Sequence, residues 1–258
     1  MTNRLIRPPA LIYLPHIEST NDFLSALLAK SEPKPGTAIT ADFQAAGKGR
    51  FGKKWHSEPG MNLLLSVLLT PDFLKAREVF FLNMLLSVTV CEVLQKKLPT
   101  HSDRISVKWP NDILVDDKKI CGLLIQNGFS GDKIQTSIAG LGLNVNQTQF
   151  EHFPGGLQPV SMSILAGKNL ETRDLLFEVI QELFQNFEDA RENREEFRTR
   201  YLSLLHGCHS VLQFQNRTDI NFKMLGKVVD IDDSGKALFD DGNFRKWISI
   251  DDWKMLVG

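Results

Sequence analysis

Residues 44–55 combine glycines with cations in a pattern that could bind an anion. The cations are Lys48, Arg50, Lys53 and Lys54, and the glycines are Gly47, Gly49 and Gly52. No acidic residue interrupts the segment, although the chain as a whole has a net charge of -1. Glycines let backbone N–H groups approach a ligand closely, and lysine and arginine neutralise phosphate. We therefore expect a phosphate-bearing ligand here, with a solvated basic loop as the alternative.

The spacing Gly-x-Gly-x-x-Gly in this segment also matches the dinucleotide-binding fingerprint. That fingerprint requires a helix directly after the glycines. Here Pro59 and Gly60 break the chain before an apolar run that is typical of a strand. The sequence thus argues against a Rossmann site and predicts a loop between two strands.

The run Lys108-Trp109-Pro110-Asn111-Asp112 ends a β-prone segment at a proline. Its tip presents an amide and a carboxylate, which could face a ligand or build an ordinary turn. A little further on, Lys118 and Lys119 precede an apolar strand that contains Gly122. A lysine at the mouth of such a strand could hold a carboxylate or an α-phosphate, or remain a solvated turn cation.

Two other segments carry polar groups at defined positions. Gly140 and Gly142 alternate on one face of a predicted strand, which leaves room for a flat group or for close helix packing. Asn144 and Asn146 follow and could hydrogen-bond a base or ribose. The triplet Ser19-Thr20-Asn21 opens a capping-box pattern and could also hydrogen-bond a compact polar ring.

The hydrophobic pattern indicates which elements hold these residues. Apolar positions at helical spacing predict helices over residues 19–30, 78–98 and from Thr172, a plausible N-cap, to about Leu205. Strands are predicted over residues 37–43, 62–70, 105–109, 113–115, 122–126 and 133–145, with turns at Pro110-Asn111 and Asn127-Gly128. The short spacings favour an α+β fold whose central sheet is mixed or antiparallel and flanked by helices.

Two domains are predicted, a catalytic domain over residues 1–207 and a small β-barrel over residues 208–258. After Gly207 short alternating runs are separated by Asp-Asp-Ser-Gly and Asp-Asp-Gly turns, as in a β meander. The composition, 42% hydrophobic and 24% charged, suits a globular core, and the balanced charge gives no chain-wide attraction for nucleic acid or anionic lipid. Three widely spaced cysteines suit reduced thiols, and residues 1–12 lack a secretory core, so we expect a cytoplasmic protein without a membrane span.

Together these segments resemble the biotin protein ligases, in that family's order from Ser19 to Asn146 and more weakly beyond. Within the glycine-rich loop the residues that fit the family pattern are Gly47, Gly49, Arg50, Gly52 and Trp55. Lys48, Phe51 and Lys53 stand where arginine is common, and Gln126 stands where glutamate is common. The resemblance implies a catalytic domain like that of class II synthetases, followed by an SH3-like barrel.

The resemblance also implies the reaction. Biotin and ATP would form biotinyl-5′-AMP with release of pyrophosphate, and a lysine of a biotin carboxyl carrier domain of the acetyl-CoA carboxylase type would then attack the mixed anhydride. The enzyme needs no nucleophile of its own, and the sequence has no His-x-x-x-His zinc pair, nucleophile elbow or Walker lysine. The expected ligands are ATP, biotin and Mg²⁺, without a dedicated protein metal site.

Carried over by motif, the expected biotin-binding residues are Ser19, Thr20, Asn21 and Gln44, with residues 47–50 (Gly47, Lys48, Gly49 and Arg50) folding over biotin. Arg50 and Lys119 would lie beside the carboxylate and α-phosphate, next to Gly122, with Lys108 and Mg²⁺ assisting. Trp55 and Asn144 would hold the adenine side. Asn111 and Asp112 would support phosphate or metal, or Asp112 would orient the incoming lysine. Cations are needed because the first step brings two anions together.

Three other functions are consistent with parts of the pattern. A lipoate–protein ligase has a similar fold and chemistry, and a non-catalytic module could bind a phosphate with the same loop. A biotin-responsive repressor would need a helix-turn-helix, and the eighteen residues before Ser19 are too few for one, so we expect no DNA binding. The sequence leaves the oligomeric state open, a homodimer included.

Overall fold

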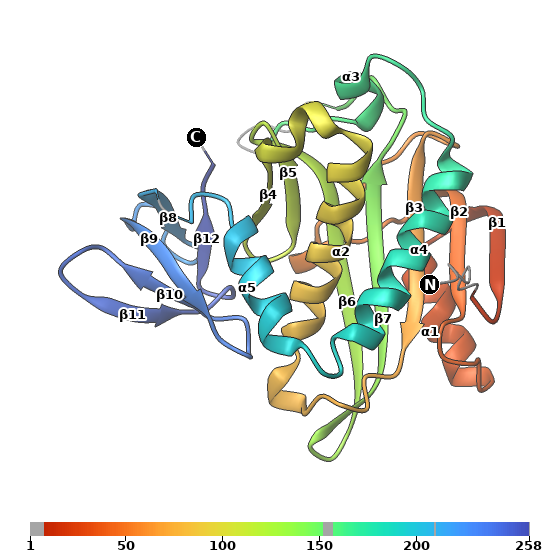
Figure 1. The fold of residues 1–258 in the computed structure, drawn as a ribbon, viewed down its shortest axis with the longest axis horizontal. Coiled ribbons are helices and arrows are strands. Elements are labelled where there is room, and N and C mark those ends of the chain that lie inside the picture. Colours follow the sequence, from red (N-terminus) through yellow and green to blue (C-terminus); the bar gives the residue numbers. More distant parts are fainter. Residues whose placement is uncertain (1–7, 152–156, 209, 258) are drawn as a thin grey trace.

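A seven-stranded mixed sheet forms the centre of the larger part of the molecule (Figure 1). The computed structural model describes residues 8–151, 157–208 and 210–257. The strands are β1 (Leu11–Ile17), β2 (Ala38–Gln44), β3 (Asn62–Leu69), β4 (Ile105–Lys108), β5 (Asp112–Val115), β6 (Lys118–Ser130) and β7 (Lys133–Asn144). Their order is β1-β2-β3-β7-β6-β5-β4, and the β1–β2 pair is parallel while the other pairs are antiparallel.

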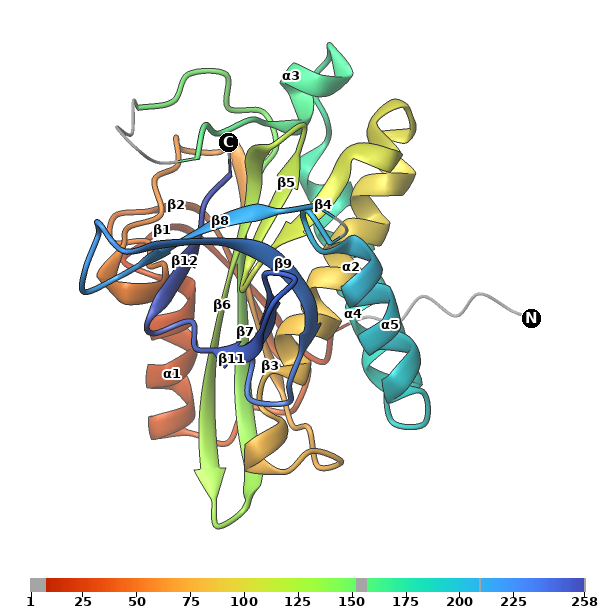
Figure 2. The ribbon, with the colours of Figure 1, turned by 90° about the vertical axis from the view of Figure 1, so that its left-hand side faces the viewer.

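Helices cover both faces of this sheet. Figure 2 shows α1 (Thr20–Lys30) on one side and α2 (Phe81–Lys97), α4 (Thr172–Asp189) and α5 (Arg194–Leu204) on the other, with the short α3 (Met162–Ala166) at one end. On the α1 side, Leu24 packs with Ile39, Leu68 and Ile138 of the sheet, while the neighbouring sheet residues face the larger core. Because both faces are covered, all eight residues of β3 are buried, which explains its continuous apolar sequence.

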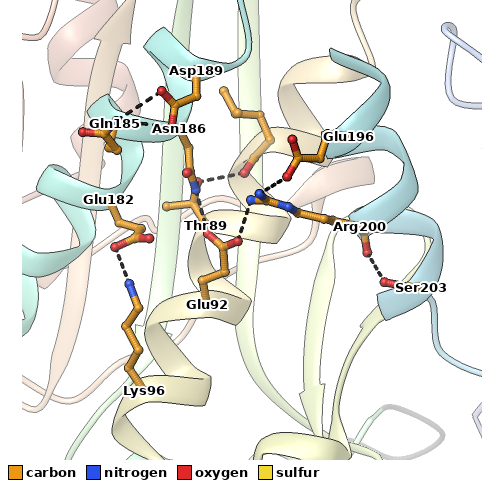
Figure 3. Close-up of polar contacts among 11 residues, drawn as sticks. Thr89, Glu92, Lys96, Glu182, Gln185, Asn186, Asp189, Glu196, Arg200 and Ser203 are labelled. Carbon is orange, nitrogen blue, oxygen red and sulfur yellow. Dashed lines mark hydrogen bonds and ion pairs between the residues drawn. The ribbon is translucent and has the colours of Figure 1, made fainter. Parts of the chain in front are cut away.

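Helix α2 lies in the larger core. The segment Ala76–Lys97 is long and apolar enough to span a membrane, with a mean hydropathy of 1.5, but 72% of its most apolar stretch is buried in this fold. A buried polar network ties α2 to its neighbours (Figure 3): Asn186 donates to Thr89 and to Glu92, at 3.1 and 2.8 Å, and Arg200 pairs with Glu92 at 3.0 Å. These contacts hold three helices together behind the sheet.

The C-terminal part is a five-stranded antiparallel sheet, consistent with the predicted SH3-like barrel. Its strands, in the order β11-β10-β9-β8-β12, are β8 (Leu212–Asn216), β9 (Lys223–Ile231), β10 (Ala237–Asp240), β11 (Arg245–Ile248) and β12 (Trp253–Met255). Among the described residues, two hydrogen bonds join its β9–β10 turn to the larger part. The indole N–H of Trp109 donates to the carbonyl of Gly235 at 2.9 Å, and the N–H of Phe80 donates to the carbonyl of Asp233 at 3.1 Å. The boundary at residue 207 stays a prediction.

The α+β class and the mixed sheet are confirmed, but two local predictions are wrong, and two strands form that the sequence did not predict. Asn127-Gly128 is not a turn, because β6 continues to Ser130 with a register shift after Gly128. A Cβ at Gly128 would lie 2.6 Å from the Thr136 hydroxyl, so this glycine allows close approach of two strands. Thr172 is the first helical residue, and Glu171 is the N-cap. Finally, β1 and β12 form by pairing with distant strands, a contact that their own residues do not signal.

Candidate active site

A cavity of about 150 Å³ gathers nearly all of the predicted site residues. It lies between the start of α1, the glycine-rich loop (residues 47–54), the β4–β5 turn, strands β6 and β7, and the C-terminal sheet. Of the predicted residues, Gly47 and Asn144 instead line an adjoining cavity of about 1050 Å³, which shares Lys108, Asp112 and Lys119 with the first. Segments far apart in the sequence therefore meet at one site.

A neutral hydrogen-bonding network forms one end of the smaller cavity. Ser19 caps α1 by accepting from the N–H of Asp22, as the capping-box pattern predicts. Gln44 Oε1 accepts from the N–H and the hydroxyl of Thr20, at 2.7 and 3.0 Å. The hydroxyl of Ser66 lies 2.7 Å from Thr20 Oγ1 and 2.6 Å from Asn21 Oδ1. These side chains are locked by one another, so the end of the cavity is pre-organised for a small polar group.

Asn21 links this network to the sheet. Its Nδ2 donates to the carbonyl of Leu124 and to Gln126 Oε1, both at 3.2 Å. An amide at position 126 thus accepts a hydrogen bond, and no carboxylate is needed for this contact. A Cβ at Gly140 would lie 2.1 Å from Asn21 Oδ1, so the glycine makes room for the helix residue. For Gly140, the structure therefore shows close helix packing, one of the two alternatives that the sequence allowed.

Cations dominate the rest of the cavity. Among the described residues that line it, eight are lysine or arginine and one is acidic. The cations are Lys48, Arg50, Lys53, Lys54, Lys108, Lys119, Arg217 and Lys254, and the carboxylate is Asp112. Such an excess of positive charge in a partly enclosed site attracts and holds a polyanion. The cavity lining therefore combines neutral polar side chains with a strong excess of cations.

Lys119 and Asp112 form the ion pair at the centre. Their Nζ and Oδ1 atoms lie 2.6 Å apart, and both side chains are largely withdrawn from solvent. Lys119 Nζ also lies 5.5 Å from the centre of the Trp55 ring, within the range of a cation–π contact. The pair brings together β5 and β6 residues that the sequence placed in separate motifs. Lys119 is consequently held in the cavity rather than solvated in a turn.

Burial changes the acidity of several cations. Lys108 is 6% exposed. Burial, opposed by Asp112 and reinforced by nearby lysines, lowers its pKa to about 8. Burial also lowers the pKa values of Arg50 and Lys53. Desolvation makes each of these charges costly, and Asp112 is the one carboxylate among the described lining residues, so an anionic ligand would relieve more of that cost.

The glycine-rich loop is a small hairpin rather than an unstructured flap. The N–H of Gly49 donates to the carbonyl of Lys53 at 2.7 Å, and the N–H of Trp55 donates to the carbonyl of Gly47 at 2.9 Å. Lys48 pairs with Asp22 of α1 at 2.7 Å. This single contact does not require the two-pronged guanidinium of arginine, which is common at this position in the family. The loop is thereby tied to the start of α1.

The flat group above the glycines of β6 and β7 is the protein's own Trp55. A Cβ at Gly142 would lie 2.5 Å from the Trp55 indole, and one at Gly122 would lie 3.1 Å from it. Among the described residues, the buried Trp55 Nε1 has no hydrogen-bond partner. The glycine stripe, for which the sequence allowed either a flat group or close helix packing, therefore holds a side chain that lines both cavities.

Three asparagines bind the main chain. Asn111 donates to the carbonyl of Leu123 at 2.6 Å, and Asn144 donates to the carbonyl of Val160 at 3.0 Å. Asn146 donates to the carbonyl of Leu170 at 2.9 Å and lines neither of these two cavities, and its suggested contact with a base or ribose stays a prediction. Asn111 and Asn144 border the cavities, and their contacts with ligand stay predictions.

Sequence reasoning missed two groups of residues. Ser66 is an inconspicuous member of an apolar strand, and its hydroxyl supports Thr20 and Asn21. The C-terminal sheet contributes Arg217, Trp253, Lys254 and Met255 to the cavity lining. No spacing connects these four to the earlier motifs, because chain folding alone brings them there. The C-terminal sheet is thus part of the site.

The described residues contain no group of three or more His, Cys, Asp or Glu that could hold a metal ion. Magnesium commonly binds through one or two carboxylates together with substrate phosphates. Asp112 is one such carboxylate, and it already faces a cation. The donor set therefore fits a magnesium ion that arrives with a polyphosphate rather than one held by the protein alone.

Comparisons with known proteins agree with this geometry. A model described as the biotin/lipoate A/B protein ligase family matches residues 13–144. The bifunctional ligase/repressor BirA of Bacillus spizizenii is 31% identical over 235 residues, covering 89% of this chain and 69% of that protein. The biotin–[acetyl-CoA-carboxylase] ligase of Mycobacterium tuberculosis is 25% identical over 91% of this chain and 84% of its own.

A solved structure matches over almost the full length. The biotin protein ligase from Aquifex aeolicus in complex with biotin and ATP superposes with a TM-score of 0.78 at 26% identity. The match covers 97% of this chain and 100% of the other, and so includes the C-terminal sheet as well as the mixed sheet.

Proposed function

The chain belongs to the biotin/lipoate A/B protein ligase family, and from this premise we propose that it joins biotin to a protein lysine at the expense of ATP. The observation that carries the proposal is one cavity whose lining combines the neutral network of Thr20, Asn21 and Gln44 with eight cations. Biotin combines an uncharged polar ring with a carboxylate, and ATP supplies the polyanion. The neutral groups suit the ring of biotin, and the cations suit its carboxylate and the phosphates.

In the first step the residues of this chain bring two anions into contact. Thr20, Asn21 and Gln44 orient the ring, so that the carboxylate points toward Lys119 and Arg50. Those cations offset the repulsion between the carboxylate and the α-phosphate, while Lys108 and Lys254 face the departing pyrophosphate. Such fixed charges act in the transition state without reorganisation, and each is worth roughly 2 to 4 kcal/mol. Magnesium bound to the phosphates would neutralise part of the remaining charge, with Asp112 as its protein ligand.

In the second step a lysine of the acceptor attacks the carbonyl carbon of biotinyl-5′-AMP. The acceptor we propose is a biotin carboxyl carrier domain of the acetyl-CoA carboxylase type. Its ammonium must lose a proton before it attacks, and AMP leaves as the new amide bond forms. Asp112, the carboxylate beside Lys119, is placed to orient that ammonium. The chain needs no nucleophile of its own for either step.

Exchange of labelled pyrophosphate into ATP, measured with biotin, lipoate or octanoate, tests this function. We expect exchange with biotin alone, followed by transfer to a carrier domain when one is added. Exchange with lipoate instead of biotin would identify a lipoate ligase. Absence of exchange with all three acids, despite binding of ATP, would indicate a module that binds phosphate without catalysis. The cytoplasmic location and the lack of DNA and membrane binding stay predictions, and the oligomeric state stays open.

A further inference from the structure

Two guanidinium groups from different parts of the chain lie over the ring of Phe51. The Arg217 guanidinium carbon lies 4.2 Å from the centre of the ring, and that of Arg50 lies 5.3 Å from it. Arg50 and Phe51 belong to the glycine-rich loop, whereas Arg217 follows β8 in the C-terminal sheet. All three line the smaller cavity. The ring therefore joins the loop to the C-terminal sheet at the edge of the site.

The backbone of Phe51 is held in an uncommon conformation. Its φ of 55° and ψ of 39° place a bulky residue in the left-handed region, which costs free energy unless surrounding contacts compensate. The ring is also 48% exposed, so burial in a core does not compensate for that cost. Of the two guanidinium groups over the ring, that of Arg217 is the nearer and comes from outside the loop, so its contact can offset part of this cost.

Arg217 itself is firmly attached to the C-terminal sheet. Its Nε donates to the carbonyl of Ile250 at 2.9 Å, and its backbone N–H donates to the carbonyl of Asp252 at 2.8 Å. These bonds tie Arg217 to residues 250–252 while its guanidinium carbon lies within cation–π range of the Phe51 ring. Lysine at this position would keep the charge but would lose both the Nε donor and the flat surface.

The two arginines also influence each other. Burial is the main cause that lowers the pKa of Arg50, and the charge of Arg217 lowers it further. Asp251 acts in the opposite direction on both groups. The electron-rich face of the ring offsets some of this repulsion, so that two cations remain next to each other in a cavity that must receive phosphate.

We propose that Arg217 is a positioning residue for the glycine-rich loop, and that its stacking on Phe51 holds Arg50 over the phosphate end of the cavity. The catalytic part of this inference rests on the proposed function, whereas the attachment of the loop does not. The C-terminal sheet thus places a catalytic cation without having to contact the reacting atoms.

A double-mutant cycle with Phe51→Leu and Arg217→Gln tests the attachment in the ligand-free protein. Amide hydrogen exchange of residues 49–53 is measured by mass spectrometry. Each single variant is expected to increase exchange about tenfold, the effect of losing one partly desolvated cation–π contact. The double variant should exchange no faster than either single one, because both substitutions remove the same contact. Phe51→Trp, which keeps an aromatic face, should preserve protection.

Arg245→Gln is the matched control, since Arg245 is an exposed arginine on β11 of the same sheet and pairs with Asp240. It should leave exchange in the loop unchanged. Additive effects of the two test variants, or loop exchange that neither alters, would overturn the proposal. A second outcome would also overturn the proposal: Arg217→Gln loses protection throughout β8 and β12, while Phe51→Leu leaves exchange in the loop unchanged. That result would show that Arg217 stabilises the C-terminal sheet instead.

Steady-state pyrophosphate exchange separates positioning from direct phosphate contact. If Arg217 acts through the loop, Phe51→Leu and Arg217→Gln should lower kcat by a similar factor, about tenfold. A rise of KM for ATP in Arg217→Gln alone, with Phe51→Leu unchanged, would contradict the proposal. If the unaltered protein shows no exchange, the proposed function fails, and the hydrogen-exchange cycle still decides whether Arg217 and Phe51 are coupled.

Discussion

Lys119 Nζ and Asp112 Oδ1 lie 2.6 Å apart in the middle of a cavity lined by seven further cations. The carboxylate holds Lys119 at the cavity in the ligand-free protein. We expect a bound substrate carboxylate or α-phosphate to replace Asp112 as the partner of Lys119 during the proposed adenylation. Several predictions depend on this arrangement.

Lys119→Ala should lower biotin-dependent pyrophosphate exchange by about a hundred- to a thousandfold, because it removes a charge that stabilises the transition state. The fold should persist, since Lys119 lies at the cavity rather than in the core. Exchange kinetics and circular dichroism on the same preparation check both statements. Lys118→Ala, at the exposed neighbouring position, is the control. Unchanged exchange in Lys119→Ala would remove this residue from the mechanism.

Affinity for ATP should fall as the pH rises through about 8, the pKa of Lys108 in the ligand-free protein. Below that pH Lys108 carries a charge that attracts phosphate, and above it the amine is neutral. Calorimetric titration with a non-hydrolysable ATP analogue, at about pH 7 and about pH 9, measures the change. In Lys108→Met the step at that pKa should disappear. A wild-type profile that stays flat across this range would contradict the role of Lys108.

The same burial predicts a stability effect of opposite sign to the effect on binding. Folding lowers the pKa of Lys108 from 10.5 to about 8. Between these values the unfolded chain binds more protons, so this residue makes the free energy of unfolding rise with pH in that window. Lys108→Met should therefore stabilise the ligand-free protein by roughly 1 to 3 kcal/mol at neutral pH while weakening ATP binding. Urea unfolding at several pH values tests this, and a destabilised variant would count against it.

Gly140→Ala and Gly142→Ala should impair different substrates although they lie two residues apart on β7. A methyl group at 140 would overlap Asn21, and one at 142 would overlap Trp55. We expect Gly140→Ala to weaken biotin binding, and Gly142→Ala to change Trp55 fluorescence and weaken nucleotide binding. Calorimetry with each ligand separates the two outcomes. Equal loss of both affinities in both variants would indicate general damage to the sheet instead.

Ser66→Ala should weaken biotin binding about threefold to thirtyfold, although Ser66 does not line the cavity. Its hydroxyl supports Thr20 and Asn21, and its removal leaves buried polar atoms without that partner. Thr89→Ala is a suitable control, because Thr89 is also a buried hydroxyl residue but lies in the helix network behind the sheet (Figure 3). Should both variants bind biotin equally well, Ser66 has no positioning role.

Local patterns predicted much of this fold. The cap at Ser19, the apolar strand at residues 62–70 and the hairpin at Pro110-Asn111 depend on neighbours in the chain, and each forms where it was expected. The glycine at position 128 shows where such reasoning fails. Glycine and asparagine together favour a turn, yet here the glycine lets Thr136 approach within a continuous hairpin. Glycine can form a turn or allow two strands to approach closely. Which of the two applies is known only when the paired strand is known.

What the sequence by itself determined is therefore the chemistry available and the elements that carry it: a cation-rich loop, lysines at strand ends and short polar side chains at a helix start. What only the tertiary structure decided is which of these groups meet. Arg217 against Phe51, Ser66 beneath Thr20 and Trp55 over Gly142 are contacts between segments well separated along the chain. The physical reason is that such contacts depend on how the sheet packs against α1 and the C-terminal strands. The periodicity of a local segment does not predict which distant segment will pack against it.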